Sequence, residues 1–289
     1  MKILVTIPHY FKQQKNATHG SQKNPQPRIQ ALTNSILSLQ QLFGKPQLMI
    51  KVGERITIPA NGLNPSSIEI IISTTGDDHL INQLPLPKNL FIQNKTQSEP
   101  LLLGFECHKI LRENIDKYDY YCFLEDDLII KDANFFTKLN WFNDVTDYQK
   151  LLLPNRYELG LNEYTGKCYI DGDLLPRVSA PFQNVNDEPE LKGQVMNQPV
   201  IFRRALNPHS GCFFLTNKQM KYWAEKPYFL DKVTNFISPL ESAATLGIMK
   251  TFKIYKPAPE SANFLEVNHL GTAFLCLLGS VVKVPNNLK

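Results

Sequence analysis

The chain has 289 residues, with 31 Lys and Arg against 27 Asp and Glu, a net charge of +4, and 43% apolar residues. A chain of this size and composition can bury roughly three quarters of its unfolded surface, so it needs no disulfide or metal ion to fold. Its 20 prolines outnumber its 14 glycines, which excludes collagen-like and low-complexity classes. The five cysteines form no C-x-x-C pair, so reduced thiols are expected rather than a zinc site.

The shortage of glycine also bears on nucleotide binding. Phosphate-binding loops of the G-x-x-x-x-G-K-[ST] and G-x-G-x-x-G types need several glycines within a few residues, and neither pattern occurs here. The phosphates of a nucleotide would therefore have to be held by other means, and the usual substitute is a divalent cation anchored by carboxylates. No apolar run reaches the roughly 20 residues of a membrane span, and the first residues do not fit a signal peptide, so a cytoplasmic protein is expected.

The first half of the sequence alternates strand and helix patterns. Apolar runs predict strands at 3–7, 68–72, 90–92 and 120–124, and apolar spacings of three and four predict helices at 28–43 and about 101–118. Strands that alternate with helices indicate an α/β fold with a mainly parallel sheet covered on both faces. Such sheets bind ligands at the carboxyl ends of their strands, where Asp77, Asp78 and an acidic triplet lie.

The second half is less regular. Helices are expected near 133–142, from 217 and at about 239–250, and strands near 151–153, 200–202, 212–216 and 252–255. The stretch from 162 to 198 is polar and rich in Pro, Gly and Asn, which indicates a long loop or lid.

The triplet Glu125-Asp126-Asp127 follows a five-residue apolar run. Unit charges about 5 Å apart repel by roughly 3 kcal/mol at an effective dielectric near 20, and a bound cation would relieve that repulsion. Oxygen ligands suit Mg²⁺ or Mn²⁺, which complete their coordination with water and phosphate oxygens. The alternative is that these acids simply end a strand in solvent. A second pair, Asp171-Gly172-Asp173, is discounted because it contains a turn-forming glycine within the irregular stretch.

A family resemblance follows from these segments. F-L-E-D-D-L at 123–128, with N-F-F at 134–136, resembles the metal and nucleotide-sugar (DXD) motif of glycosyltransferases with the Rossmann-like GT-A fold, especially the inverting N-acetylglucosaminyltransferase I type. The segments 210–216 and 256–261 resemble that family's apolar strand after a glycine and its closing Arg-Pro-Glu segment. The resemblance implies one GT-A-like domain over 1–289, with a nucleotide-sugar half at 1–131 and an acceptor half at 132–289.

The resemblance also implies roles for single residues. Asp127 would bind the metal, Glu125 and Asp126 would face the ribose or the donor sugar, and Asp77 would bind the base. Arg28, at the start of the first predicted helix, would meet the base or diphosphate. Asp77 and Asp78 equally fit N-terminal caps of a following segment, and Arg28 equally fits a solvated surface position.

An inverting transfer needs a base for the acceptor hydroxyl, and the candidate is Glu241, with Asp231 and Glu260 as alternatives. S-P-L-E at 238–241 is also a capping box, in which Glu241 would bind the backbone N–H of Ser238. The tryptophan-flanked acid pair of the family is absent, which leaves the base and the stereochemical outcome open.

Further candidates lie toward the carboxyl terminus. By the resemblance, His269 would be a second metal ligand, although a loop histidine also fits a hydrogen-bonded surface position. Arg203 and its neighbour Arg204 are candidates for the departing diphosphate or an acidic acceptor, and Gly211 would let the backbone approach the sugar. The apolar tail at 274–284 fits a last core element or a contact with a membrane surface.

The resemblance implies a glycosyltransferase that uses Mn²⁺ or Mg²⁺. Its donor would be a nucleotide sugar, with a UDP-sugar favoured, and its acceptor a carbohydrate or a lipid-linked molecule. No Lys/Arg block of five or more occurs, so no nucleic-acid partner is expected. A peripheral position at the inner membrane face is compatible with the tail. The alternatives are an inactive GT-A-like protein that binds a glycan or a metal, and a nucleotidyltransferase.

Overall fold

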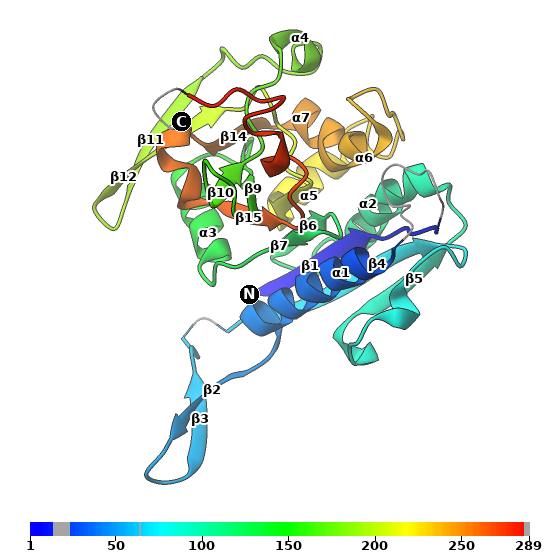
Figure 1. The fold of residues 1–289 in the computed structure, drawn as a ribbon, viewed down its shortest axis with the longest axis vertical. Coiled ribbons are helices and arrows are strands. Elements are labelled where there is room, and N and C mark those ends of the chain that lie inside the picture. The colour runs from blue at the N-terminus through cyan, green and yellow to red at the C-terminus, as the bar shows by residue number, and fades with distance from the viewer. Residues whose placement is uncertain (14–23, 64, 286–289) are drawn as a thin grey trace. The chain divides into compact units, whose positions relative to one another are not determined.

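A computed structural model describes residues 1–13, 24–63 and 65–285 of the chain (Figure 1). The chain divides into two compact units. Unit 1 comprises Met1–Asp126 and Phe214–Glu225, and unit 2 comprises Asp127–Phe213 and Lys226–Lys289. In the described part of the chain, no helix is long and apolar enough to cross a lipid bilayer.

Unit 1 is built on a five-stranded sheet with the order β13-β6-β1-β4-β5, in which β1 pairs in parallel with β4 and β6, and β4 with β5. The strands are β1 (Lys2–Pro8), β4 (Ser67–Thr75), β5 (Ile92–Thr96), β6 (Tyr120–Leu124) and β13 (Cys212–Thr216), of which the last three residues of β13 belong to this unit. The helices are α1 (Gln26–Leu39), α2 (Leu103–Glu113) and α5 (Asn217–Ala224), with a π-helical turn η1 (Gln40–Gly44) and 3₁₀ turns η2 (Ile81–Gln83), η3 (Lys88–Leu90) and η4 (Pro100–Leu102).

Burial explains why these segments form a covered sheet. All five residues of β6 are buried, and five consecutive residues of β1 are buried, so both faces of these strands are covered. Helix α1 turns Ile29, Leu32, Ile36 and Leu39 inward at helical spacing, and α2 packs against β1, β4 and β6. The predicted α/β class with a parallel sheet is therefore confirmed.

A separate hairpin also belongs to unit 1. Strands β2 (Gln47–Lys51) and β3 (Ile56–Ala60) pair antiparallel and form a two-stranded sheet of their own. In Figure 1 the hairpin extends away from α1 and the five-stranded sheet. The sequence analysis predicted no strand here.

Unit 2 contains two four-stranded sheets, with the orders β10-β9-β15-β7 and β11-β12-β14-β8. Its strands are β7 (Leu128–Ile129), β8 (Lys150–Leu152), β9 (Asn155–Leu159), β10 (Lys167–Tyr169), β11 (Glu190–Val195), β12 (Gln198–Arg204), β14 (Lys253–Pro257) and β15 (Glu266–His269). Its helices are α3 (Phe135–Val145), α4 (Pro176–Ser179), α6 (Pro239–Glu241) and α7 (Gly247–Thr251), with a π-helical turn η5 (Ser242–Leu246) and 3₁₀ turns η6 (Pro259–Phe264) and η7 (Leu275–Leu277).

Two sequence-based expectations need correction in unit 2. The stretch 162–198 is not irregular throughout, because it contains β10, α4 and β11, and β11 pairs with β12 over six residues from Glu190 to Val195. In the apolar tail, Leu275 is buried, whereas Phe274, Val281 and Val282 are exposed. The tail therefore contributes to the core through Leu275 rather than as a whole.

Candidate functional site

The carboxyl ends of the parallel strands in unit 1 bring several polar residues to one edge of the sheet. His9 follows β1, Asp77 follows β4, and Glu125 and Asp126 follow β6. Because parallel strands end at the same edge, this edge is where an open α/β sheet offers a ligand crevice. The sequence predicted the two acidic groups there but assigned no role to His9.

Asp126 is held by two basic side chains of the same unit. Its Oδ2 lies 2.6 Å from Nδ1 of the fully buried His9, and its Oδ1 accepts a hydrogen bond from Nη1 of Arg28. His9 Nε2 accepts from the backbone N–H of Leu80 at 3.1 Å, so its proton resides on Nδ1, which donates to Asp126. Arg28 and Asp126, both predicted as donor-binding residues, are thus brought together.

The charge state of Asp126 follows from these contacts. Burial opposes ionisation of the carboxyl, but the charge of Arg28 and the hydrogen bond from His9 outweigh it and hold the pKa of Asp126 below its usual value. Asp126 is therefore an oriented carboxylate at the end of β6.

Asp77 and Asp78 do not cap the following helical turn. That turn, η2, begins at Ile81 and has Leu80 as its N-cap residue, with no side-chain cap. Asp77 is exposed, and Asp78 lies 3.4 Å from Lys12. The cap alternative is therefore wrong, and the role of Asp77 in base binding stays a prediction.

A second arrangement of acid and imidazole lies in unit 2. The final residue of β15, His269, pairs across the sheet with Leu128, which follows Asp127, and the backbone N–H of Leu270 donates to the carbonyl of Asp127 at 2.9 Å. This register places Nε2 of His269 3.8 Å from Oδ2 of Asp127. The two residues predicted as metal ligands are therefore neighbours.

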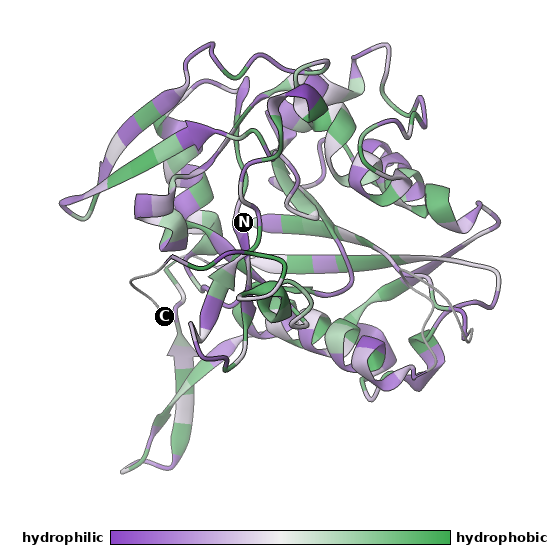
Figure 2. Ribbon diagram, turned by 45° about the horizontal axis from the view of Figure 1, so that its top comes forward, coloured by the Kyte–Doolittle hydropathy of each residue, from purple (hydrophilic) through white to green (hydrophobic). Residues whose placement is uncertain are grey.

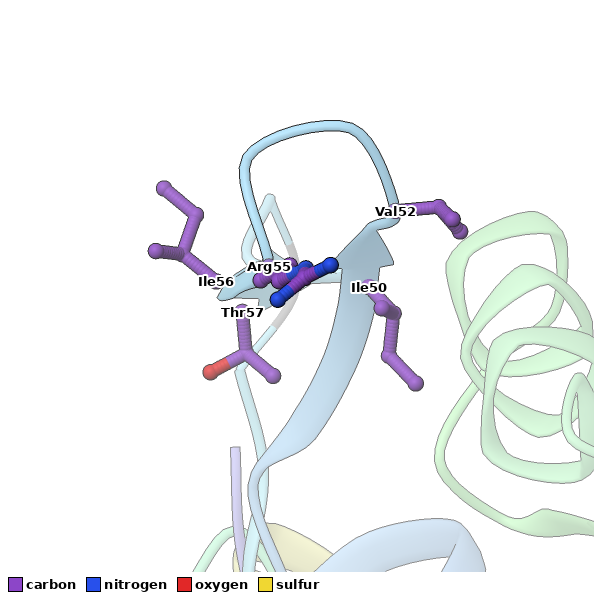
Figure 3. Close-up of a pocket in the computed structure, with 5 residues that line it drawn as sticks. All are labelled: Ile50, Val52, Arg55, Ile56 and Thr57. Carbon is purple, nitrogen blue, oxygen red and sulfur yellow. The ribbon is translucent and has the colours of Figure 1, made fainter.

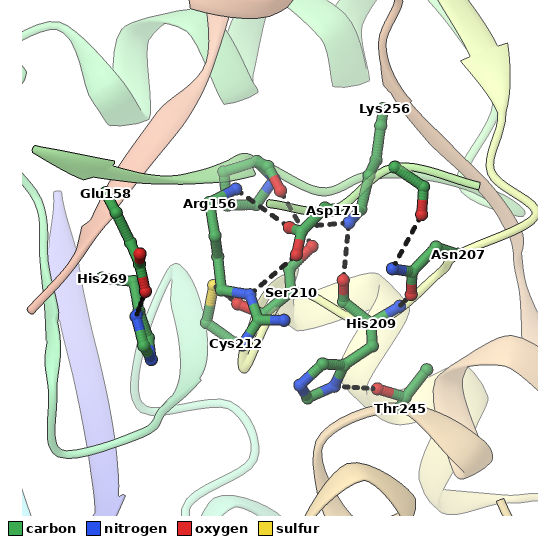
Figure 4. Close-up of polar contacts among 12 residues, drawn as sticks. Arg156, Glu158, Asp171, Asn207, His209, Ser210, Cys212, Thr245, Lys256 and His269 are labelled. Carbon is green, nitrogen blue, oxygen red and sulfur yellow. Dashed lines mark hydrogen bonds and ion pairs between the residues drawn. The ribbon is translucent and has the colours of Figure 1, made fainter. Parts of the chain in front are cut away.

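Glu158 fixes the orientation of this histidine. It is fully buried at β9, and its Oε1 lies 3.1 Å from Nδ1 of His269. Its Oε2 accepts hydrogen bonds from the backbone N–H groups of Phe274 and Leu275 at 3.0 and 2.7 Å. Glu158 contacts Nδ1 of His269 (Figure 4), so the other ring nitrogen, Nε2, is the one that lies toward Asp127.

The donor set of this pair is one carboxylate and one imidazole. Among the described residues, no group of three or more His, Cys, Asp and Glu could hold a metal ion, whereas a structural zinc site has four protein ligands. Mg²⁺ binds through one or two carboxylates together with water and substrate phosphates. The carboxylate of Asp127 suits a site of that kind, and the imidazole of His269 adds a donor that suits transition metals.

A buried ionic cluster surrounds Asp171, the residue that the sequence analysis discounted (Figure 4). Oδ1 of Asp171 accepts from Nε of Arg156 at 2.9 Å, and Oδ2 accepts from the Arg156 backbone N–H at 2.9 Å and from Nζ of Lys256 at 3.0 Å. Lys256 also donates to the carbonyl of His209 at 2.6 Å, and His209 Nδ1 lies 3.0 Å from the hydroxyl of Thr245.

The charge states of the buried groups in this cluster follow from their surroundings. Burial lowers the pKa of His209 well below its usual value, and the charge of Arg156 lowers it further, so the imidazole is neutral. Burial also lowers the pKa of Lys256, whereas Asp171 remains acidic because Lys256 and Arg156 outweigh the effect of its burial. Two cations therefore share one carboxylate inside unit 2.

Comparison with known proteins adds the following. No protein-family model and no curated protein matches the sequence. Among solved structures, the chain is similar to S. aureus TarS 1-349 in complex with UDP, at 11% identity and a TM-score of 0.47, over 93% of this chain and 60% of that one. It is similar to GalNAc-T7 with UDP, GalNAc and Mn²⁺, at 10% identity and a TM-score of 0.47, over 92% of this chain and 43% of that one.

A third similar structure is HddC from Yersinia pseudotuberculosis complexed with GMP-PN, at 12% identity and a TM-score of 0.39, over 90% of this chain and 96% of that one. The chain thus spans only 60% and 43% of the lengths of the TarS and GalNAc-T7 chains. Likenesses with TM-scores under 0.5 carry no weight for the activity, which has to be inferred from the residues of this chain.

The remaining predicted residues have partners elsewhere in unit 2. Arg203 and Glu260 contact each other, with Nη2 of the arginine 2.8 Å from Oε1 of the glutamate, and Arg203 Nε also lies 3.3 Å from Glu190. Asp231 lies 3.7 Å from Lys250. Gly211 has a φ of +63°, a left-handed conformation that favours glycine.

The capping-box alternative for Glu241 is not what the structure shows. Ser238 is the N-cap residue of α6, but no side-chain cap hydrogen bond forms there. Its hydroxyl instead donates to Oε2 of Glu241. The role of Glu241 as a base stays a prediction, as do the roles of Asp231 and Glu260.

His9, Arg156, Glu158 and Lys256 had no assigned role in the sequence analysis. The segments 210–216 and 256–261, named for their resemblance, adjoin His209 and contain Lys256. No sequence pattern pointed to Glu158, because its partners at 269, 274 and 275 are more than 100 positions away.

Proposed function

We propose that this protein is a metal-dependent glycosyltransferase that moves a sugar from a nucleotide-sugar donor, a UDP-sugar in the first instance, to a hydroxyl group of a carbohydrate or lipid-linked acceptor. The observation that supports the proposal most is the pairing of Asp127 with His269 at 3.8 Å, with Glu158 behind the histidine. Two protein ligands backed by a buried carboxylate suit a cation that also binds phosphate oxygens.

The preceding residue, Asp126, supports the same reaction class. It ends β6 as a carboxylate oriented by His9 and Arg28, at the sheet edge where α/β folds receive ligands. A carboxylate accepts up to about four hydrogen bonds, so its contacts with these two residues leave capacity for the hydroxyl groups of a ribose or a sugar.

In the proposed reaction, the acceptor oxygen forms a bond to the anomeric carbon of the donor sugar while the bond from that carbon to the diphosphate oxygen breaks. The acceptor proton passes to a carboxylate, for which Glu241 is the first candidate. A bound Mn²⁺ or Mg²⁺ would stabilise the negative charge that develops on the departing nucleoside diphosphate.

The other candidate bases are less suited to take a proton. A hydrogen bond from its own backbone N–H and another from Arg203 lower the pKa of Glu260, which makes its carboxylate a weaker base. Asp231 lies 3.7 Å from Lys250, so its carboxylate already faces a cation. Glu241 contacts the neutral hydroxyl of Ser238 instead.

Calorimetric titration of UDP with and without Mn²⁺ tests the donor site. We expect Mn²⁺ to strengthen UDP binding in the natural protein, and Asp127→Asn to remove that gain, a loss of about tenfold or more in affinity. Asp147→Asn is the matched control, because Asp147 is an exposed acid of unit 2 that pairs with Lys150. Equal UDP affinity in the natural protein and Asp127→Asn, with unchanged circular dichroism, would refute the proposal.

An activity assay separates the alternatives. A glycosyltransferase releases UDP from UDP-sugars when acceptors are supplied, and slowly to water without them. An inactive GT-A-like protein would bind UDP with Mn²⁺ but release none. A nucleotidyltransferase would instead form pyrophosphate from a nucleoside triphosphate and a sugar 1-phosphate.

A further inference from the structure

Among the described residues, the β2–β3 hairpin is anchored to the rest of unit 1 through its base. At the base, Nε2 of Gln47 donates to the backbone carbonyls of Gln41 and Leu42 at 3.2 and 3.4 Å. Beyond this anchor the two strands pair only with each other. An isolated two-stranded hairpin is marginally stable in water, so the apolar side chains that this one exposes call for an explanation.

The hairpin exposes apolar side chains on both of its faces. Residues directly opposite each other in an antiparallel pair share a face, and successive residues alternate between faces. Leu48 and Ile50 therefore lie on one face, while Met49 lies on the other, opposite Ile58. Ile50 and Val52 are 69% and 81% exposed. Hydrophobic segments are visible along the hairpin in Figure 2.

The turn combines this apolar surface with positive charge. Ile50, Val52, Arg55, Ile56 and Thr57 line an open pocket there (Figure 3). Around the turn, residues 50–57 carry Lys51 and Arg55 against Glu54, a net charge of +1. Glu54 is paired with Lys51 at 3.2 Å. An apolar tip bordered by cations is the composition that binds an interface of lipid tails and anionic headgroups.

We propose that the tip of the β2–β3 hairpin inserts into the surface of an anionic lipid membrane. Insertion by about 5–10 Å would place the side chains of Ile50, Val52 and Ile56 at the boundary of headgroups and acyl chains. The long side chains of Lys51 and Arg55 would reach back to the level of the phosphates, with Glu54 still paired to Lys51. The unpaired edges of the hairpin keep it out of the hydrocarbon core, where unsatisfied backbone groups cost several kcal/mol each, so it stays at the interface.

A second copy of the chain fits this hairpin less well. A protein partner that packs on one face leaves the apolar side chains of the other face in water, whereas a lipid interface surrounds both. Strand addition at the edge of β3 is also impaired, because Pro59 has no N–H to donate. The proposal does not depend on the glycosyltransferase assignment, since it concerns where the protein binds and not what it catalyses.

Vesicle sedimentation tests the proposal. The full chain is mixed with vesicles of phosphatidylcholine alone or with about one third phosphatidylglycerol, and we expect binding to the anionic vesicles only. The triple variant Ile50→Ser/Val52→Ser/Ile56→Ser should bind about tenfold more weakly. The variant Lys51→Glu/Arg55→Glu should also bind more weakly, by about fivefold for each cation removed.

The matched control is Leu161→Ser/Met196→Ser, which removes two apolar side chains that are 99% and 93% exposed in unit 2. It should bind anionic vesicles like the natural protein. A direct probe is Val52→Trp in a background where Trp141 and Trp223 are both Phe, because insertion should shift its emission to the blue.

Several results would overturn the proposal. These are no binding to anionic vesicles, equal binding to neutral ones, or undiminished binding by the triple variant. Light scattering provides a further test, because a dimer in solution that the triple variant dissociates would identify a second copy as the occupant of the hairpin.

Discussion

Asp171→Asn is the substitution that most directly tests the buried ionic cluster of unit 2. The side chain keeps its size and one acceptor oxygen but loses the negative charge that Arg156 and Lys256 share. Both cations are themselves buried, and the carboxylate accepts three hydrogen bonds from them, at 2.9, 2.9 and 3.0 Å. The variant therefore removes the charge of a carboxylate that both buried cations contact.

The expected loss follows from the energetics of buried ion pairs. Removing one partner of such a pair destabilises a protein by about 3–5 kcal/mol, chiefly because the remaining charge stays uncompensated. Lys256→Met should destabilise less, by about 1–3 kcal/mol, since Asp171 keeps Arg156 and only the hydrogen bonds of the ammonium are lost. In the double variant Asp171→Asn/Lys256→Met, the negative charge and one of its cations are removed together. Its loss of unfolding free energy should therefore be about 1–3 kcal/mol smaller than the sum of the losses in the two single variants.

Urea unfolding followed by tryptophan fluorescence measures these values unit by unit. The chain has two tryptophans, and they lie in different units, Trp141 in unit 2 and Trp223 in unit 1. In a Trp223→Phe background, the signal comes from Trp141 alone and reports on unit 2. Asp173→Asn is the control, because Asp173 belongs to the same Asp-Gly-Asp motif but is exposed, and its loss should stay within about 0.5 kcal/mol.

Either of two results would contradict the dependence of Arg156 and Lys256 on Asp171. One is a loss below about 1 kcal/mol for Asp171→Asn, which would mean that the two cations do not depend on this carboxylate. The other is strict additivity in the double variant, because residues that share an ionic network should couple.

Two further predictions concern the candidate site. Glu158→Gln should weaken Mn²⁺ binding by about 10–100-fold, because His269 loses the carboxylate that orients it. Electron paramagnetic resonance of free Mn²⁺ measures this affinity, and an unchanged value would contradict the role of Glu158. The stability conferred by the ion pair of Arg28 and Asp126 should depend on pH, because the pKa of Asp126 is lower in the folded protein than in the unfolded chain. The ion pair stabilises the fold at pH values above the unfolded pKa of about 3.9. This stabilisation is lost as the pH falls through the folded-state pKa. The difference in unfolding free energy between the natural chain and Arg28→Met, read from Trp223 in a Trp141→Phe background, should therefore shrink below about pH 4, and a constant difference would exclude the pairing.

The sequence predicts the five-stranded sheet well because its central strands obey simple patterns. The residues of β6 are apolar without interruption and are all buried, and Ile29, Leu32 and Ile36 mark the inward face of α1. The acidic ends of β4 and β6 follow from the same patterns, because a parallel sheet collects its carboxyl ends at one edge.

Strands β9 and β15 of unit 2, which carry Arg156, Glu158 and the candidate metal ligand His269, escape such patterns. In β9, the polar residues Asn155, Arg156 and Glu158 are buried, and each finds its partner far along the chain. Apolar periodicity cannot detect a strand whose buried side chains are polar and mutually satisfied. The prediction for Asp171 was wrong because an Asp-Gly pair indicates a turn, and the cations that bind this aspartate lie far away in the sequence.

The division of the chain also has a consequence for its synthesis. Unit 1 is made of two separate stretches, since Phe214–Glu225 supplies the end of β13 and α5 to a sheet otherwise complete by Asp126. At about 5–20 residues per second, the ribosome takes about 5–20 s to add the intervening residues. During that time the neighbouring strand β6 lacks its partner β13, so the nascent sheet has an open, apolar edge. Unit 1 cannot complete its fold before most of unit 2 has been translated, and a chaperone that covers strand edges would act in this interval.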